Sequence, residues 1–257
     1  MTAGVAAVFV TLIVILILFS DLVTSYIPFS VEKKFAPDIL RESSTKGPLP
    51  DYLNKLTAKI VAAEELPTEM TITVHYLDDD TVNAFATIGG HVFVFRGLLE
   101  KLPNENALAM LLAHEIAHIK HRHPIRSLGR GVIISLALSL LGSESSESIN
   151  AGFLGEAGFL TIMKYSRDME TEADKTAIAA LLVNYGHLAG AADLFKTLKI
   201  QDDDLEMPEF FSTHPLSEER LASIDDYMQT IAVENKGSNK ITLLPKLFKT
   251  WLKNDSE

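Results

Sequence analysis

The sequence predicts an α+β fold in which helices predominate over one small β-sheet, preceded by a transmembrane helix. After residue 50, apolar side chains recur mostly at the three- and four-residue spacing of amphipathic helices. Strand-like patterns are confined to residues 71–95. The N-terminal residues 3–19 carry no charge, which separates them from the rest of the chain.

Composition narrows the classes of function. The chain of 257 residues is 47% hydrophobic, which allows a full core. Its net charge of −11 argues against nucleic acid as a partner, because phosphate binding needs basic patches. There is no cysteine, so disulfides, thiolate metal ligands and a cysteine nucleophile are excluded. Any metal must therefore be held by His, Asp or Glu side chains.

The apolar run at residues 3–19 can cross most of the hydrocarbon layer of a bilayer. As a helix it extends about 25 Å at a rise of about 1.5 Å per residue. It lacks the basic start and the cleavage site of a secretory signal peptide. The alternative is a buried core helix, but a helix apolar on every face is unusual at a chain end. We therefore predict a transmembrane anchor over residues 1–23, with membrane lipid as its partner.

The segment after the anchor is expected to be a connector, over residues 24–50, because prolines and the stretch ESSTKG interrupt any regular pattern. The main domain is expected at 51–233. Its first elements are predicted as a helix at 51–65, a strand at 71–77 and two short strands within 83–95 around Gly89-Gly90.

A helix that Asn104 caps is predicted to follow and to run to about His123, where Pro124 ends or kinks it. The next apolar run, 131–142, is too short to cross a bilayer, so a buried and a membrane-dipping helix both remain open. A polar loop is expected at 143–150. Further helices are predicted at 151–164, 168–185, 188–199 and 216–231.

The stretch LLAHEIAHIKHRHP, residues 111–124, concentrates histidines in an otherwise apolar helix. Residues four apart lie on one helix face, so His114 and His118 can reach the same ion. Glu115 lies on the adjacent flank. Two imidazole ligands and a carboxylate that can take a proton from zinc-bound water form the H-E-x-x-H arrangement.

A third protein ligand is needed to complete such a site. The variant H-E-x-x-H-x-x-G-x-x-H does not apply, because His121 and Pro124 occupy its last two defined positions. On a straight helix His121 would give poor tetrahedral geometry. We therefore interpret His121 and His123 as residues behind the ligands, at the surface or at the helix end.

The stretch YSRDMETEADKTA, residues 165–177, offers a better third ligand. Glu170 can complete the site from a second helix. Asp174 lies one turn further along and can accept the second N–H of a ligating histidine. For Glu172 we accept the simpler interpretation of an exposed acidic helix face.

These motifs and STHPLSEER together resemble the HtpX-like and CAAX-prenyl-protease-type family of membrane-associated zinc metallopeptidases, which are gluzincins. The similarity covers about residues 51–231. It implies a zincin-like metallopeptidase domain with one Zn²⁺ per chain and Glu170 as the third ligand. It also matches the family's H-P-x-x-x-x-R element to His214 and Arg220. Without the resemblance, these two residues would be an ordinary loop and helix start.

The expected function is therefore a membrane-anchored, zinc-dependent endopeptidase in membrane or envelope protein quality control. Zinc lowers the pKa of its water, Glu115 acts as the base, and His214 or Arg220 donates to the oxyanion. The polypeptide substrate is expected to lie as an extended strand against Asn83, Ala84, Phe85 and Ala86. A catalytically silent zinc-binding membrane scaffold and a hydrolase of other substrates remain as alternatives.

The side of the membrane is indicated in two opposite ways. Resemblance to anchored relatives favours a bacterial inner membrane with the peptidase domain in the periplasm. Basic residues follow the anchor and none precedes it, which favours the cytoplasm under the positive-inside rule.

The C-terminal residues 234–257 are predicted to form a linker and a basic amphipathic tail. Within 240–253 there are four lysines and no acidic residue. One interpretation is a helix in the membrane interface, and the other is a helix packed on the domain core. On such a helix the apolar residues that share one face are Leu244, Leu247, Phe248, Trp251 and Leu252.

Overall fold

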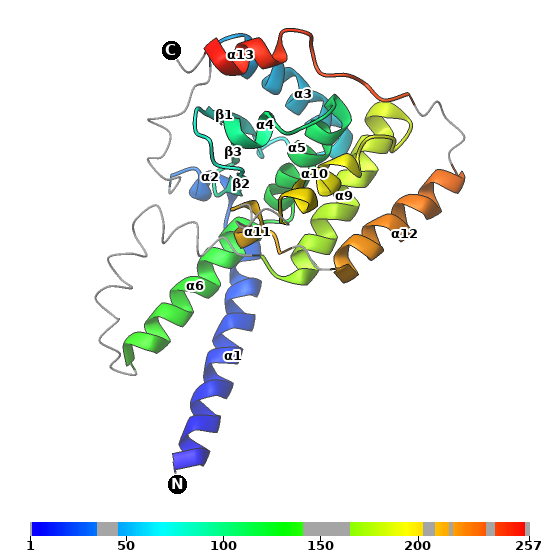
Figure 1. Cartoon of the computed structure of the whole chain (residues 1–257). Coiled ribbons are helices and arrows are strands. Elements are labelled where there is room, and N and C mark those ends of the chain that lie inside the picture. The colour runs from blue at the N-terminus through cyan, green and yellow to red at the C-terminus, as the bar shows by residue number, and fades with distance from the viewer. Residues whose placement is uncertain are drawn as a thin grey trace.

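The computed structural model describes residues 2–34, 46–140, 165–202, 209–215, 218–234 and 240–254. Figure 1 shows a mostly helical body with a small sheet, from which two long helices extend on one side. The predicted class, α+β with helices predominating, is confirmed. The polar loop expected at 143–150 and the helix expected at 151–164 lie outside the described residues.

The sheet has three strands in the order β1-β3-β2. β1 (Thr73–Leu77) runs parallel to β3 (His91–Phe95), and β2 (Ala84–Thr87) runs antiparallel to it, with Ala84 opposite Val94. The hairpin predicted around Gly89-Gly90 is present, and both glycines have positive φ angles of 81° and 89°. A Cβ at Gly90 would overlap the carbonyl oxygen of Thr71, so glycine is required at this position.

Three helices form the core with the sheet: α3 (Pro48–Glu64), α5 (Glu105–Lys120) and α9 (Arg167–Tyr185). α5 is the central one, and every side chain from Asn106 to Ile119 is buried. The Asn104 side chain caps it as predicted, accepting a hydrogen bond of 2.8 Å from the N–H of Ala107. Burial of each large aliphatic side chain contributes about 1.5–3 kcal/mol, so the interior stabilises α5 far more than its cap does.

The other elements lie around this core. Gly190 has a φ of 83°, which lies outside the α-helical region, so a regular helix cannot run through it. The helix predicted from 188 therefore begins at Asp193. The smaller and peripheral elements are α2 (Phe29–Glu32), α4 (Arg96–Leu99), α10 (Asp193–Asp202), α11 (Phe210–Thr213) and α12 (Glu218–Glu234).

α1 (Thr2–Tyr26) is long and apolar enough to cross a membrane, by length and composition, over Ala7–Thr24. α6 (His123–Leu140) contains the second apolar run and lies alongside α1 (Figure 1). Arg130 donates from Nε to Asp21 of α1 at 2.8 Å. Gly129 packs closely against Ser20 of α1, so a Cβ at this position would displace the Ser20 hydroxyl.

The tail forms an extended segment and the short helix α13 (Phe248–Asn254), which packs on the domain. Phe248 and Leu252 are each 1% exposed. The N–H of Thr242 donates to Oδ1 of Asn106 at 2.7 Å, which ties the tail to the first turn of α5. The structure thus shows the core-packed form of the tail, at the end of the domain away from α1 (Figure 1).

Candidate metal centre

The H-E-x-x-H residues lie on the most deeply buried helix of the domain. α3, α9 and the sheet contact α5. His114, Glu115 and His118 therefore leave the helix inside the protein, and all three are almost completely buried. A run of polar side chains in such a position requires a specific partner for each.

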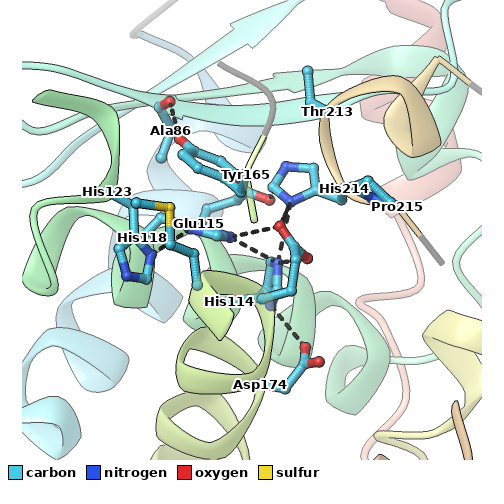
Figure 2. A network of polar contacts seen from close by, with 12 residues as sticks. Ala86, His114, Glu115, His118, His123, Tyr165, Asp174, Thr213, His214 and Pro215 are labelled. Atoms are coloured by element: carbon cyan, nitrogen blue, oxygen red, sulfur yellow. Dashed lines mark hydrogen bonds and ion pairs between the residues drawn. The ribbon is translucent and has the colours of Figure 1, made fainter. Parts of the chain in front are cut away.

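Four side chains place one nitrogen or oxygen each around a common point: His114, His118, Glu170 and His214. The Nε2 atoms of His114 and His118 are 3.0 Å apart, and Nδ1 of His214 is 3.2 Å from Nε2 of His114. Oε1 of Glu170 lies 3.1 Å from Nδ1 of His214 and 3.5 Å from Nε2 of His118. Figure 2 shows the three imidazoles turned toward one another.

This arrangement fits a tetrahedral zinc ion. With bonds of about 2.0–2.1 Å, neighbouring ligand atoms of such a site are about 3.3 Å apart. Here the separations among His114, His118 and Glu170 run from 3.0 to 3.5 Å, and the ligand atoms of all four residues lie within 4.8 Å of one another. Three imidazoles and one carboxylate also suit zinc chemically. The residues form a buried metal site, and they include His214, which the sequence indicated only as a catalytic residue.

Asp174 and Arg220 lie directly behind this cluster. Oδ1 of Asp174 is 3.0 Å from Nδ1 of His114, the position predicted for it. Arg220 donates from Nε and Nη2 to both oxygens of Asp174, at 2.7 and 2.9 Å, and its Nη1 is 2.6 Å from Oε2 of Glu170. Arg220 thus holds two carboxylates, where the sequence had suggested a donor to an oxyanion.

These contacts set the charges of the ligands. Burial opposes the ionised form of Glu170, but the nearby His214 and its other hydrogen-bond partners hold the pKa of Glu170 well below its usual range. Burial likewise opposes charge on His114, yet its hydrogen bonds to Asp174 and Glu170 raise the pKa of His114 to about 10. The two carboxylates stay ionised and provide the negative charge that a divalent cation needs.

Glu115 lies beside the cluster and is fully buried. Neither of its carboxylate oxygens has a hydrogen-bond partner among the residues that the structure describes. Its Oε1 is 3.4 Å from Nε2 of His214. An unpaired buried carboxylate is costly to a folded protein, so its presence here indicates a chemical role.

His214 comes to the cluster from the end of α11. Its ring stacks on Phe210, with centroids 4.5 Å apart and an interplanar angle of 20°. The N–H of Phe210 donates to the carbonyl of Val82 at 3.2 Å, which fixes α11 beside β2. The STHPLSEER motif therefore provides the fourth side chain of the cluster, next to β2.

Comparison with known proteins identifies the family. The model of Peptidase family M48 matches residues 50–228, well over half of the chain. The chain belongs to peptidase family M48. The resemblance found in the sequence motifs is confirmed.

Known relatives of this M48 chain come from mitochondria and bacteria. The mitochondrial metalloendopeptidase OMA1 of Schizosaccharomyces pombe is 29% identical over 225 residues, which cover 81% of this chain and 64% of the relative. A putative beta-barrel assembly-enhancing protease of Vibrio cholerae is 34% identical over 188 residues, covering 67% and 38%. The beta-barrel assembly-enhancing protease of Escherichia coli is 28% identical over 237 residues, covering 80% and 47%. The chain thus spans less than two thirds of the length of these relatives.

β2 forms one edge of the sheet next to the M48 site. The carbonyl of Asn83 accepts from the N–H of Phe95 at 3.2 Å, so Asn83 turns its main chain toward β3. In an antiparallel pair this orientation alternates, so Phe85 also faces β3 while Ala84 and Ala86 face the outer edge. Of the four predicted substrate-strand residues, two therefore have main-chain groups on the outer edge.

Tyr165 is a site residue that the sequence did not reveal. Its ring stacks on His118, with centroids 3.9 Å apart and an angle of 15° between the planes. Its hydroxyl donates to the outward carbonyl of Ala86 at 3.2 Å (Figure 2). The only signal in the sequence is its position just before Ser166, which caps α9.

His123 and Glu172 lie behind His118. His123 is fully buried, and its Nδ1 is 2.8 Å from Nδ1 of His118. Burial lowers the pKa of His123 to about 4, against the opposing effect of Glu172. Glu172 is exposed, as expected, and its oxygens lie 3.1 Å from His123 and 3.2 Å from His121. His121 itself lies outside the metal cluster.

Proposed function

We propose that this chain is a membrane-anchored endopeptidase that hydrolyses peptide bonds with one Zn²⁺ ion. The observation that carries the proposal is the convergence of His114, His118 and Glu170 beside an unpaired Glu115. His114, His118 and Glu170 would hold the ion, and His214, the fourth member of the cluster, would stand beside the position that a catalytic site leaves to water. Membership of peptidase family M48 supports the reaction type.

The residues around the site have distinct tasks in this reaction. Zinc, when bound, acts as a Lewis acid and lowers the pKa of water toward neutrality. Glu115 takes a proton from the attacking water and later delivers it to the leaving nitrogen. His214 faces Glu115 and donates to the oxyanion that develops at the scissile carbonyl. Asp174 orients His114, and Arg220 fixes Asp174 and Glu170.

The substrate is a polypeptide that pairs with the outer edge of β2. Ala84 and Ala86 offer main-chain N–H and C=O groups in this direction, and the hydroxyl of Tyr165 marks one position that a substrate N–H would take over. Recognition through main-chain groups depends little on side chains. It suits the turnover of misfolded membrane or envelope proteins.

The anchor of this enzyme is α1. Between Ala7 and Val23 its exposed side chains are apolar except for Thr11, whose hydroxyl donates to the carbonyl of Ala7 in the same helix. Its one acidic residue, Asp21, is paired with Arg130 of α6 near the domain end. We place the anchor in a bacterial inner membrane with the peptidase domain in the periplasm. The names of the bacterial relatives, which refer to β-barrel assembly, support this side.

The deciding experiment compares Glu115→Gln with the wild type in zinc content and in cleavage of an unfolded protein. Glu115→Gln should keep one zinc per chain and lose cleavage by a factor of about 10²–10⁴, because it removes the base and leaves the ligands. Glu170→Ala should lose zinc as well as activity. Metal removal with a chelator should stop cleavage, and added zinc should restore it.

The alternatives give different results in the same assay. A zinc-binding scaffold would bind the metal and cleave nothing as wild type. A hydrolase of other substrates would leave unfolded protein intact but turn over a non-peptide ester or amide in a zinc-dependent way. Stoichiometric zinc and full activity in Glu170→Ala would show that the third ligand is assigned wrongly.

A further inference from the structure

His118 is connected to the protein surface through a second histidine and a glutamate. Nδ1 of His118 lies 2.8 Å from Nδ1 of His123, and Nε2 of His123 lies 3.1 Å from Oε2 of Glu172. Both imidazoles are fully buried, whereas the side chain of Glu172 is 49% exposed. The three groups thus form a continuous path from the metal cluster to solvent.

The geometry assigns the proton on each ring. Nε2 of His118 points into the cluster, so its lone pair is the one available to a metal and the hydrogen resides on Nδ1. Nδ1 of His123 faces this N–H and must accept it. The hydrogen of His123 then lies on Nε2, which donates to Glu172. In this arrangement His118 donates to His123, His123 donates to Glu172, and Glu172 only accepts.

We propose that His123 and Glu172 are positioning residues that orient His118 and strengthen it as a metal ligand. A carboxylate that accepts from an imidazole makes the ring a better donor, and a second imidazole passes this effect on. The inference rests on the proposed zinc site. It goes further because it gives His118 an acidic partner, Glu172, which acts through His123. Asp174 is the corresponding partner of His114 and contacts it directly.

The two ligand histidines are supported differently. His114 contacts a carboxylate that is buried and held by Arg220 at 2.7 and 2.9 Å. His118 instead contacts His123, which in turn contacts the exposed carboxylate of Glu172 on α9. Loss of Glu172 should therefore weaken metal binding without removing it.

Two neighbouring residues provide matched controls. His121 contacts Glu172 at 3.2 Å and stacks on His123 with ring centroids 5.6 Å apart, but it has no contact with His118 among the described residues, so it shares the surroundings of the path without linking to the ligand. Asp168 lies one turn before Glu172 on the same face of α9 and is exposed. Asp168→Asn removes the same charge from the same helix face, outside the path.

The test measures zinc affinity of the full chain by competition with a chelator, together with the visible absorption spectrum of the cobalt-substituted protein. Glu172→Gln should raise the dissociation constant of zinc about tenfold, and His123→Phe by about ten- to a hundredfold. Both should shift the cobalt spectrum, because the donor strength of His118 changes. Glu172→Asp should recover part of the affinity.

The control variants show whether zinc binding weakens because His118 loses its orientation, or only because α9 loses a negative charge or the protein loses stability. His121→Asn and Asp168→Asn should leave zinc affinity and cobalt spectrum as in the wild type. Wild-type affinity and spectrum in Glu172→Gln would overturn the proposal, as would equal weakening in Asp168→Asn. If His123→Phe does not fold, Glu172→Gln decides alone, since its side chain is half exposed. A wild type that binds no zinc would instead refute the zinc site itself.

Discussion

At the scale of single residues, Glu64 shows how the core around α5 depends on pH. It is the last residue of α3, is 3% exposed, and neither carboxylate oxygen has a hydrogen-bond partner among the described residues. Burial raises the pKa of Glu64 to about 8, although Lys120 at the end of α5 opposes the rise. The buried carboxyl therefore takes up a proton that the unfolded chain would not hold near neutral pH.

We predict that this residue destabilises the fold increasingly as the pH rises. Below its ordinary value of 4.5 the group is protonated in both states and has no effect. Between that value and about 8 only the folded state keeps the proton, so the free energy of unfolding falls by up to about 1.4 kcal/mol per pH unit. Glu64→Gln should remove this dependence.

Denaturant unfolding of the wild type and Glu64→Gln at pH 5 and pH 8.5 would measure the effect. Glu64→Gln should gain stability relative to the wild type at pH 8.5, by a few kcal/mol more than at pH 5. A difference between the two proteins that does not vary with pH would show that Glu64 does not titrate in this range.

Residue by residue, the sequence predicted the part of the site that depends on helix periodicity. His114 and His118 are four apart on a helix, so their shared direction follows from local geometry alone. Asp174 was expected behind a ligating histidine because it lies one turn after Glu170, and the structure has its Oδ1 3.0 Å from Nδ1 of His114. Glu172 is exposed as predicted, but its contact with His123 could not be foreseen, because an exposed glutamate has the same pattern whether or not the start of α6 packs against it.

At the scale of elements, the C-terminal tail is the clearest case of two hypotheses that one pattern could not separate. A basic amphipathic helix suits a membrane surface and a domain surface equally well. The structure places Phe248 1% exposed against the core, whereas Leu247 beside it is 57% exposed. α13 also lies at the far end of the domain from α1 (Figure 1).

We predict that the tail is a structural element, which a pair of adjacent substitutions can test. Phe248→Ala should cost about 3–5 kcal/mol and lower the melting temperature by roughly 10 °C. Leu247→Ala should change stability by less than about 0.5 kcal/mol. Liposome binding by both variants should match the wild type. Weaker binding of Leu247→Ala to anionic liposomes, at unchanged stability, would favour the membrane hypothesis.

For the other elements, the sequence predicted whether each is a helix or a strand better than it predicted where each begins and how the strands pair. The Gly89-Gly90 hairpin and the Asn104 cap appear as expected because each depends on a local conformation. The start of α10 was missed because the chain passes through Gly190 in a left-handed conformation before the helix begins at Asp193, and apolar spacing does not reveal this conformation. The strand order β1-β3-β2 likewise follows from pairing between segments and not from their local patterns.

At the scale of the whole molecule, the anchor and the metal site are closely joined. Arg122, between α5 and α6, donates to the carbonyl of Ile27 at 2.6 Å and pairs with Glu32 of α2 at 2.5 Å. Glu32 also accepts from the N–H of Gly89 in the hairpin at 3.3 Å. The ion pair between Arg122 and Glu32, with the hydrogen bonds that each of them makes, thus connects the segment after α1, the end of α5 and the hairpin of the sheet. A membrane that holds α1 therefore holds the site at its surface.

The absence of cysteine in the chain allows the membrane arrangement to be tested with single introduced cysteines. Leu12 lies in the middle of α1 and is 52% exposed, while Val183 and Leu243 lie on the domain and are 71% and 76% exposed. A membrane-impermeant maleimide should label Val183→Cys and Leu243→Cys in intact spheroplasts, because the domain is proposed to face the periplasm. Leu12→Cys should react only after detergent is added, because lipid covers α1.

Labelling of the two domain positions only after lysis would place the domain in the cytoplasm, as the positive-inside rule favours. Free labelling of Leu12→Cys in intact membranes would show that α1 does not lie in the bilayer.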